Sequence, residues 1–147
     1  MSDALPVYWT ESFTDVYVAA LNGDAEFRKV ARKTHENFEL RCWDTPRGTD
    51  VIVRYRIDGG HVTSQWEEEP APSSALRSRA YDKRTTLART SAPYTVWKKL
   101  DTKEMGVIDA VLSPLYKFEG AKLKVLSNIR IFVRMGDIAS DIEKAYE

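Results

Sequence analysis

The stretch from Asn37 to Trp66 carries the strongest pattern in the sequence, because apolar and polar side chains alternate there with a period of two. Such alternation is typical of β-strands that bury one face. The turn-forming sequences DTPRG and DGG divide the stretch into three runs, and each of them can reverse the chain. The sequence therefore predicts an antiparallel meander of three strands, whose apolar face other elements must cover.

Two helices are predicted before this meander. Apolar residues recur at helical spacing from Trp9 to Leu21, and Asn22-Gly23 supplies a helix stop. Asp24 can cap a second, short helix with the sequence AEFRKVARK. We expect this pair of helices to form a flank or a lid of the sheet.

The segment EEEPAPSS, which follows the meander, has no periodicity and contains two prolines. It predicts an exposed, mobile loop that extends over residues 67–80. Its acidic run is typical of a solvated loop edge, and a role in repelling anionic headgroups or steering a basic partner is the alternative. A fourth strand is predicted from Arg84 to Thr90.

Two further helices are predicted after the fourth strand. Ser91 can cap a short helix that contains Trp97, with Pro93 in its first turn. Asp101 and Glu104 resemble a capping box for the next helix. The apolar residues of that helix recur at helical spacing as Met105, Ile108, Val111 and Leu112, before Ser113-Pro114 ends it.

The last part of the chain predicts a short strand and a terminal helix. The sequence KLKV alternates as a fifth strand, and Ser127 or Asn128 can cap the helix. One apolar stripe of this helix consists of Ile131, Phe132, Met135, Ile138, Ala139, Ile142 and Tyr146. Ile129 and Val133 widen the apolar arc to more than half of the circumference, so apolar partners are expected on more than one side. Gly136 costs about 1 kcal/mol relative to Ala and marks a kink, a break or a close contact.

Length and charge narrow the class of protein. A chain of 147 residues with 43% hydrophobic residues is the size of one domain with a real core. Its 22 basic and 22 acidic residues cancel, which argues against nucleic acid as a partner. No apolar run reaches the roughly 20 residues that cross a bilayer, and the N-terminus lacks the pattern of a signal peptide. We expect a cytoplasmic protein.

Residues that could carry catalysis or bind a metal are few. Cys42 is the one cysteine, so neither an internal disulfide nor a cysteine-based metal cluster can form. It falls on the apolar face of a predicted strand, where a buried thiol is commoner than a nucleophile. His35 is predicted to close a helix and His61 to open a strand, and neither matches a triad or a metal site. We expect no catalytic residue, no metal and no cofactor.

The order of several short pieces resembles the sterol carrier protein type-two family. These pieces are LNGDAEFRKVAR, the glycine hairpin RIDGGHV, the helices PYTVWKKL and MGVIDAVLS, and the basic segment KLKV before an apolar helix. The likeness runs roughly from Trp9 to Tyr146. It departs from the family where Leu126-Ser127-Asn128 replace the usual glycine after the last strand, and in the end Ala145-Tyr146-Glu147, which is not the peroxisomal tripeptide of some relatives.

This resemblance implies an α+β fold. The single domain of residues 1–147 would have a five-stranded, mostly antiparallel sheet with helices packed on one face and an apolar tunnel between the layers. Two readings of the terminal helix stay open: its stripe fills a solid core, as such stripes usually do, or it closes one wall of a ligand cavity, which the resemblance favours. In the second reading the lining is Val111, Leu112, Leu115, Phe118, Ile131, Phe132 and Met135, with Trp97 and Trp66 at its edge.

The resemblance also implies a function. The protein would bind and carry an apolar small molecule, such as a fatty acid, an acyl-CoA or a sterol-like compound, without catalysing a reaction. Because each buried methylene is worth about 0.8 kcal/mol, affinity would be micromolar. Selectivity for chain length would be broad. The alternatives are an accessory or interaction subunit of a metabolic enzyme, and an enzyme acting on an acyl thioester through Cys42. The oligomeric state, a homodimer included, stays open.

Overall fold

A computed structural model gives the structure of residues 4–147, with the side chains of Val107 and Val111 outside the description. The elements in chain order are α1 (Glu11–Gly23), α2 (Ala25–Val30), β1 (His35–Trp43), β2 (Thr49–Asp58), β3 (His61–Pro70), α3 (Ser74–Arg77), β4 (Ala88–Pro93), α4 (Tyr94–Asp101), α5 (Val107–Leu112), β5 (Lys117–Gly120), α6 (Lys122–Ser127) and α7 (Ile129–Asp141).

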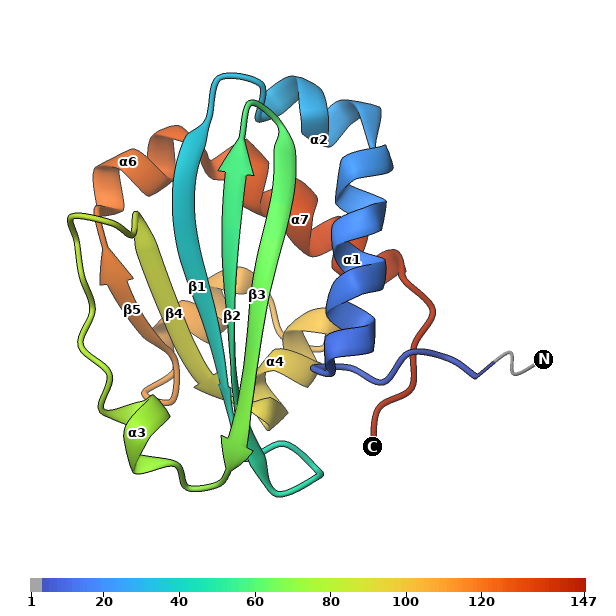
Figure 1. The fold of residues 1–147 in the computed structure, drawn as a ribbon, viewed down its shortest axis with the longest axis vertical. Coiled ribbons are helices and arrows are strands. Elements are labelled where there is room, and N and C mark those ends of the chain that lie inside the picture. The colour runs from blue at the N-terminus through green and yellow to red at the C-terminus, as the bar shows by residue number, and fades with distance from the viewer. Residues whose placement is uncertain (1–3) are drawn as a thin grey trace.

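The five strands form one sheet in the order β3-β2-β1-β4-β5 (Figure 1). The predicted meander is confirmed, since β1 pairs antiparallel with β2, and β2 with β3. Gly59 and Gly60 close the second hairpin with φ angles of 61° and 88°, as a tight turn of this kind requires. Strand β4 lies parallel to β1 and antiparallel to β5. The predicted α+β class with a mostly antiparallel, five-stranded sheet is therefore confirmed.

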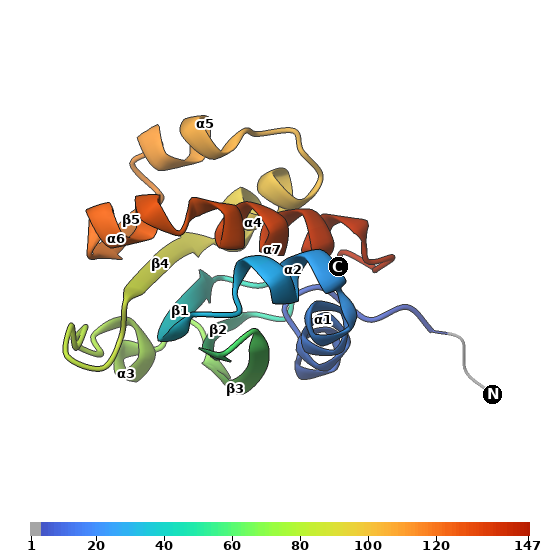
Figure 2. The ribbon, with the colours of Figure 1, turned by 90° about the horizontal axis from the view of Figure 1, so that it is seen from above.

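Helices cover one face of the sheet. Figure 2 shows α4 and α7 in a layer above the strands, and α5 farther out, on the side of α7 that faces away from the sheet. Helix α1 packs on this face near the edge strand β3, and Asp24 caps α2 as predicted, because its carboxylate accepts a hydrogen bond from the backbone N–H of Phe27 at 2.8 Å. The apolar residues of β1 and β2 point into the space under these helices, where Val51, Val53 and Ile57 are buried.

The prediction of a loop over residues 67–80 was wrong in its first part. Strand β3 continues through the acidic run to Pro70, because β2 offers a full ladder of partners as far as Thr49. Cations also neutralise the run: Arg47 contacts Glu68 at 2.5 Å and Arg79 contacts Glu67 at 2.7 Å. Side-chain charge alone did not mark the end of the strand.

Strand β4 and helix α4 begin later than predicted. Strand β4 starts at Ala88, and Ser91 lies inside it opposite Arg41 instead of capping a helix. Helix α4 follows Pro93 without a side-chain cap. Asp101 ends α4 instead of opening α5, and α5 starts after Gly106 without the predicted capping box. In each case a strand pairing or a buried contact outweighs the local capping signal.

The fifth strand was predicted in the wrong place. Residues Lys117–Gly120 form β5, and the sequence KLKV belongs to α6. Polar and apolar residues often alternate over four positions by chance, so such a short run is weak evidence for a strand. The position of β5 is set instead by its pairing with β4. His35 was also misplaced: it opens β1 instead of closing a helix.

Two glycines should respond in opposite ways to replacement by alanine. A Cβ on Gly120 would lie 2.6 Å from the carbonyl oxygen of Leu87, at a φ of 149°. We expect Gly120→Ala to cost about 1 to 3 kcal/mol of stability, through overpacking and backbone strain. A Cβ on Gly136 would meet nothing within 4 Å, and α7 runs through this residue. We expect Gly136→Ala to stabilise the protein by up to about 1 kcal/mol.

Urea unfolding of both variants checks this pair of predictions. A destabilised Gly136→Ala would mean that something packs against that residue, which is the close contact left open by the sequence. An unchanged Gly120→Ala would show that β5 can move away from β4 without cost.

Candidate functional site

The space between the sheet and α7 is largely filled by aromatic side chains. Tyr17 stands edge-on to Tyr55 with ring centres 5.9 Å apart, and Phe38 stacks on Tyr55 at 5.2 Å. Phe132 of α7 meets Phe38 edge-on at 5.5 Å. Burial raises the pKa values of Tyr17 and Tyr55, so both phenols stay neutral. The layer is a packed aromatic core at this point.

A small cavity remains in this core, with a volume of about 90 Å³. Its lining consists of Tyr8, Trp9, Phe13, Thr14, Tyr17, Leu40, Val53, Tyr55, Trp97 and Ala139. A cavity of about 150 Å³ is known to hold one benzene molecule. The cavity is therefore too small for a long hydrocarbon chain, and it does not have the room of the tunnel that the resemblance implies.

The residues predicted to line a ligand cavity are divided between the interior and the surface. Ile131 and Met135 are buried, Trp97 lines the small cavity, and Trp66, Phe118 and Phe132 are half-buried. Leu112 and Leu115 are 77% and 58% exposed. The side chain of Val111 lies outside the described residues. The structure thus does not gather the eight described members of this set around one space.

A different apolar feature lies on the outside of the helical layer. Nine large apolar side chains are exposed among the described residues, and seven of them fall between residues 108 and 133. These seven, which we call the outer apolar surface, are Ile108, Leu112, Leu115, Leu123, Leu126, Ile129 and Val133. Soluble proteins seldom expose apolar residues in such groups unless something binds there.

The outer apolar surface has a simple geometric basis. Helices α6 and α7 follow each other in the chain with Asn128 between them (Figure 2), and Leu123, Leu126, Ile129 and Val133 recur along them at intervals of three or four residues. Helix α5 lies on the outer side of α7 in the same view and buries Ala110 while Ile108 stays 75% exposed.

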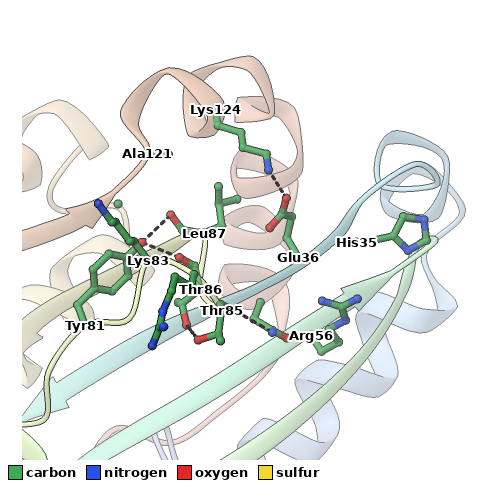
Figure 3. A pocket seen from close by; sticks show the side chains of 13 residues that line it. His35, Glu36, Arg56, Tyr81, Lys83, Thr85, Thr86, Leu87, Ala121 and Lys124 are labelled. Carbon is green, nitrogen blue, oxygen red and sulfur yellow. Dashed lines mark hydrogen bonds and ion pairs between the residues drawn. The ribbon is translucent and has the colours of Figure 1, made fainter.

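A polar pocket opens at one end of the sheet (Figure 3), with a volume of about 600 Å³. Its walls come from the start of β1, from β2, from the loop before β4, from the end of β5 and from α6. The lining consists of His35, Glu36, Asn37, Arg56, Tyr81, Lys83, Arg84, Thr85, Thr86, Leu87, Gly120, Ala121 and Lys124. Figure 3 shows Tyr81 and Lys83 on one side, Arg56 and His35 on the other, and Lys124 above.

Local hydrogen bonds hold the loop that forms one wall of this pocket. The hydroxyl of Tyr81 lies 2.6 Å from the carbonyl oxygen of Thr86 and can donate to it. Asn37 donates to the carbonyl oxygen of Thr85 at 2.9 Å. Lys124 forms an ion pair with Glu36 at 2.5 Å across the upper rim. The pocket wall is therefore ordered by contacts that leave most of the cationic side chains at the surface.

The groups considered for catalysis sit in unsuitable surroundings. Cys42 is buried, and burial raises the pKa of its thiol, which disfavours the reactive thiolate. His35 contacts Asp58 at 2.5 Å beside the hairpin turn, with both side chains more than half exposed. Among residues 4–147, no group of three or more His, Cys, Asp or Glu side chains is placed to hold a metal ion. No helix in this part of the chain is long and apolar enough to span a membrane.

Sequence reasoning missed the polar pocket altogether. Arg84 was predicted to open the fourth strand and Lys124 to lie in the fifth, and no ligand was predicted for Lys83, Arg84 or Lys124. The pocket joins five segments that are far apart in the sequence, so no local pattern marks it. The cluster of basic residues from Arg77 to Arg84 gave a partial signal. It carries more positive charge than is needed to neutralise the acidic run.

Comparison with solved structures identifies the fold. The crystal structure of sterol carrier protein 2 matches with a TM-score of 0.72 and 15% sequence identity, over 92% of this chain and 99% of that chain. The solution structure of a conserved hypothetical protein from Thermus thermophilus matches with a TM-score of 0.70 and 13% identity, over 98% and 97% of the two chains. Sterol carrier protein 2 from Yarrowia lipolytica, in its apo form, matches with a TM-score of 0.56 and 10% identity, over 96% and 97%.

These likenesses establish the fold. No family model matches the sequence, and no curated protein matches it. The chain has the fold of sterol carrier protein 2, which confirms at the level of fold the resemblance seen in the order of sequence pieces.

Proposed function

We propose that this protein, with the fold of sterol carrier protein 2, binds an apolar or amphiphilic small molecule and carries it without chemical change. The observation that supports this most directly is the outer apolar surface, where seven large apolar side chains are 43% to 84% exposed. An uncovered apolar area of this kind is stabilised when a hydrocarbon displaces water from it. Fatty acyl chains and sterol-like compounds are the ligand classes that fit.

The proposed ligand lies along α6 and α7, on the side where α5 is found, and not in the aromatic core. The core cavity of about 90 Å³ has no room for it. Each methylene removed from water contributes about 0.8 kcal/mol, and a chain lying on a helix face buries only part of its surface. After the cost of association, micromolar affinity and weak selectivity for chain length follow.

A charge placed in the middle of the outer apolar surface should abolish this binding. Val133 is 53% exposed on α7, so Val133→Asp leaves the core intact. The new carboxylate would have to lose water when a hydrocarbon covers it, which is unfavourable. We expect the affinity for a fluorescent fatty acid to fall at least tenfold, as measured by titration of its fluorescence.

Val16→Asp is the matched control. Val16 is also an exposed valine in a 13-residue helix, at 42% exposure, but it lies on α1, outside the outer apolar surface. We expect this variant to bind like the original protein. Equal loss in both variants, or uptake unaffected by Val133→Asp, would remove the outer apolar surface as the binding site. Phe132→Asp is a poorer test, because the Phe132 ring packs against Phe38 and its loss would disturb the fold.

The outer apolar surface is also compatible with a second function, as the contact of an accessory subunit with an enzyme or with a second copy of this chain. Apolar patches with a polar rim are found at protein interfaces as well as at ligand sites. Native mass spectrometry of the purified protein separates the two readings. A co-purified acyl or sterol-like molecule supports the carrier, whereas a ligand-free dimer or a stable complex with an enzyme supports the interaction module.

A further inference from the structure

We propose that the polar pocket binds a phosphate-bearing headgroup, so that the ligand of this protein is an amphiphile whose hydrocarbon part lies on the outer apolar surface. This inference rests on the proposed function and adds to it the chemical class of the ligand. It is carried by the charge of the pocket, by its size, and by its position next to the apolar track.

The charge of the pocket is cationic. Arg56, Lys83, Arg84 and Lys124 line it, against one carboxylate, Glu36. Two carboxylates outside the lining partly neutralise these cations, since Asp58 lies 3.5 Å from Arg56 and Asp82 lies 3.3 Å from Arg84.

Lys83 has no ion-pair partner in the part of the chain that the structure describes. Four cations thus face three carboxylates, and Asp58 is shared between Arg56 and His35.

The existing ion pairs of the pocket can be exchanged for a ligand. Arg84 is 85% exposed and Lys124 is 55% exposed, and exposed pairs of this kind contribute little to stability. Guanidinium and ammonium groups bind phosphate oxygens through charge-assisted hydrogen bonds, and arginine does so with two parallel bonds. The cations are therefore free to turn toward an anion with several oxygens.

The size of the pocket favours a phosphate-bearing group over a simple carboxylate. A volume of about 600 Å³ is far larger than the share of about 30 Å³ that one water molecule takes in the liquid. The cations come from β2, the loop before β4 and α6, so they surround the space instead of flanking one point. One carboxylate would reach few of them, whereas a phosphate with its substituent can contact several walls.

The position of the pocket links it to the outer apolar surface through α6. This helix turns Lys124 into the pocket and leaves Leu123 and Leu126 exposed at 84% and 62%. From Leu126 the apolar track continues to Ile129 and Val133 on α7. The pocket and the outer apolar surface therefore meet at α6, where Lys124 and Leu123 are neighbours in the chain, so an amphiphile can place its anionic end among the cations and its chain on the apolar side chains of α6 and α7.

The test compares three probes on the same protein: dodecyl phosphate, dodecanol and inorganic pyrophosphate. Each is titrated against a bound fluorescent fatty acid or by calorimetry, below the micelle concentration and at low salt. We expect dodecyl phosphate to bind at least tenfold more tightly than dodecanol. That preference should shrink when salt is raised, because exposed charges are screened, and pyrophosphate alone should bind much more weakly.

The variant that removes the inferred contacts is Lys83→Ala with Arg84→Ala. Both side chains are exposed, so the fold is retained, and circular dichroism checks this. We expect the double variant to lose the preference for dodecyl phosphate and to bind dodecanol as before. Arg28→Ala with Lys29→Ala removes the same two kinds of charge from an exposed face of α2, outside the pocket, and should keep the preference.

The outcomes separate this inference from the proposed function. Equal binding of dodecyl phosphate and dodecanol would overturn the headgroup site and leave the carrier function standing. Binding of neither compound would overturn the carrier function itself. Pyrophosphate binding as tightly as dodecyl phosphate, lost in the Lys83 and Arg84 variant, would show a site for free phosphate and overturn the headgroup assignment.

Discussion

Replacing Lys144 by Met is expected to cost about 3 to 5 kcal/mol of stability, because it leaves a buried carboxylate without its counter-ion. The side chains of Lys144 and Asp101 are each 2% exposed, and their charged atoms lie 2.5 Å apart. Lys144 also donates to the carbonyl oxygen of Ala139 at 2.6 Å. Its ammonium group lies 5.4 Å and 5.5 Å from the ring centres of Tyr8 and Phe13, which adds cation–π attraction.

This ion pair ties the C-terminal segment to α4 beside the core cavity. Ala145 continues the attachment, since its carbonyl oxygen accepts from the N–H of Tyr8 at 2.9 Å. Lys103→Met is the matched control, because its ion pair with Asp137 is exposed, with 65% and 45% exposure and a distance of 3.5 Å. We expect that control to cost under about 1 kcal/mol.

Urea unfolding with the slope of the transition checked for each variant measures both effects. The double variant Lys144→Met with Asp101→Asn should recover part of the loss, since no buried charge then remains unpaired. A Lys144→Met variant no less stable than Lys103→Met would contradict the assignment of a buried ion pair.

The second large effect is expected for Asp50→Ala, also at about 3 to 5 kcal/mol. The Asp50 side chain is fully buried and accepts hydrogen bonds from the backbone N–H groups of Asp44 at 3.0 Å and Ser73 at 2.8 Å. Arg77 adds two hydrogen bonds at 2.7 Å and 2.9 Å. Alanine would leave these donors without their acceptor, among them the buried N–H of Ser73, and an unsatisfied buried group costs about 1 to 3 kcal/mol.

Asp44→Ala is the control for Asp50→Ala. Asp44 contacts the same Arg77 at 3.0 Å but is 64% exposed, so its loss should cost under about 1 kcal/mol. Equal effects of the two substitutions would show that Arg77 alone, and not the buried acceptor, carries the stabilisation.

The effect of Asp50→Ala should also depend on pH. Burial alone would raise the pKa of Asp50, but the hydrogen bonds from Arg77, Ser73 and Asp44 more than offset it, and the pKa lies below its ordinary value. The stabilisation is therefore complete above the unfolded pKa of about 3.9, and is lost as the pH falls through the lower folded pKa. We expect the gap between the original protein and Asp50→Ala to be constant near neutral pH and to narrow below about pH 4.

The structure places the two parts of the apolar arc of the terminal helix in different surroundings. The stripe with Ile131 and Met135 packs into a core, as apolar stripes usually do. The extra width that Ile129 and Val133 give to the apolar arc is real, but it faces outward. The structure places no apolar partner on this outer side among the described residues, and the partner that we propose for it is a ligand on the outside of the layer.

Hydrophobic periodicity predicted those helices and strands that have a regular apolar face. The meander, the first two helices and most of the terminal helix were placed correctly, because alternation and helical spacing report which side of each element is apolar. The predicted stripe was too long at its end, since α7 stops at Asp141, before Ile142 and Tyr146. The same signal failed for α5, where Ile108 and Leu112 recur like core residues and are exposed. A helical stripe shows that one face is apolar, but it does not say whether another element covers that face.

The sequence by itself determined the antiparallel meander and the pair of helices that precedes it, since each follows from local spacing, whereas the α+β class followed from the resemblance to a known family. Only the tertiary structure decided that the core closes to a cavity of about 90 Å³, that α5 leaves its apolar side uncovered, and that five distant segments meet in a cationic pocket. These features depend on how faces far apart in the sequence are brought together, and that is set by strand pairing and by packing across the layers.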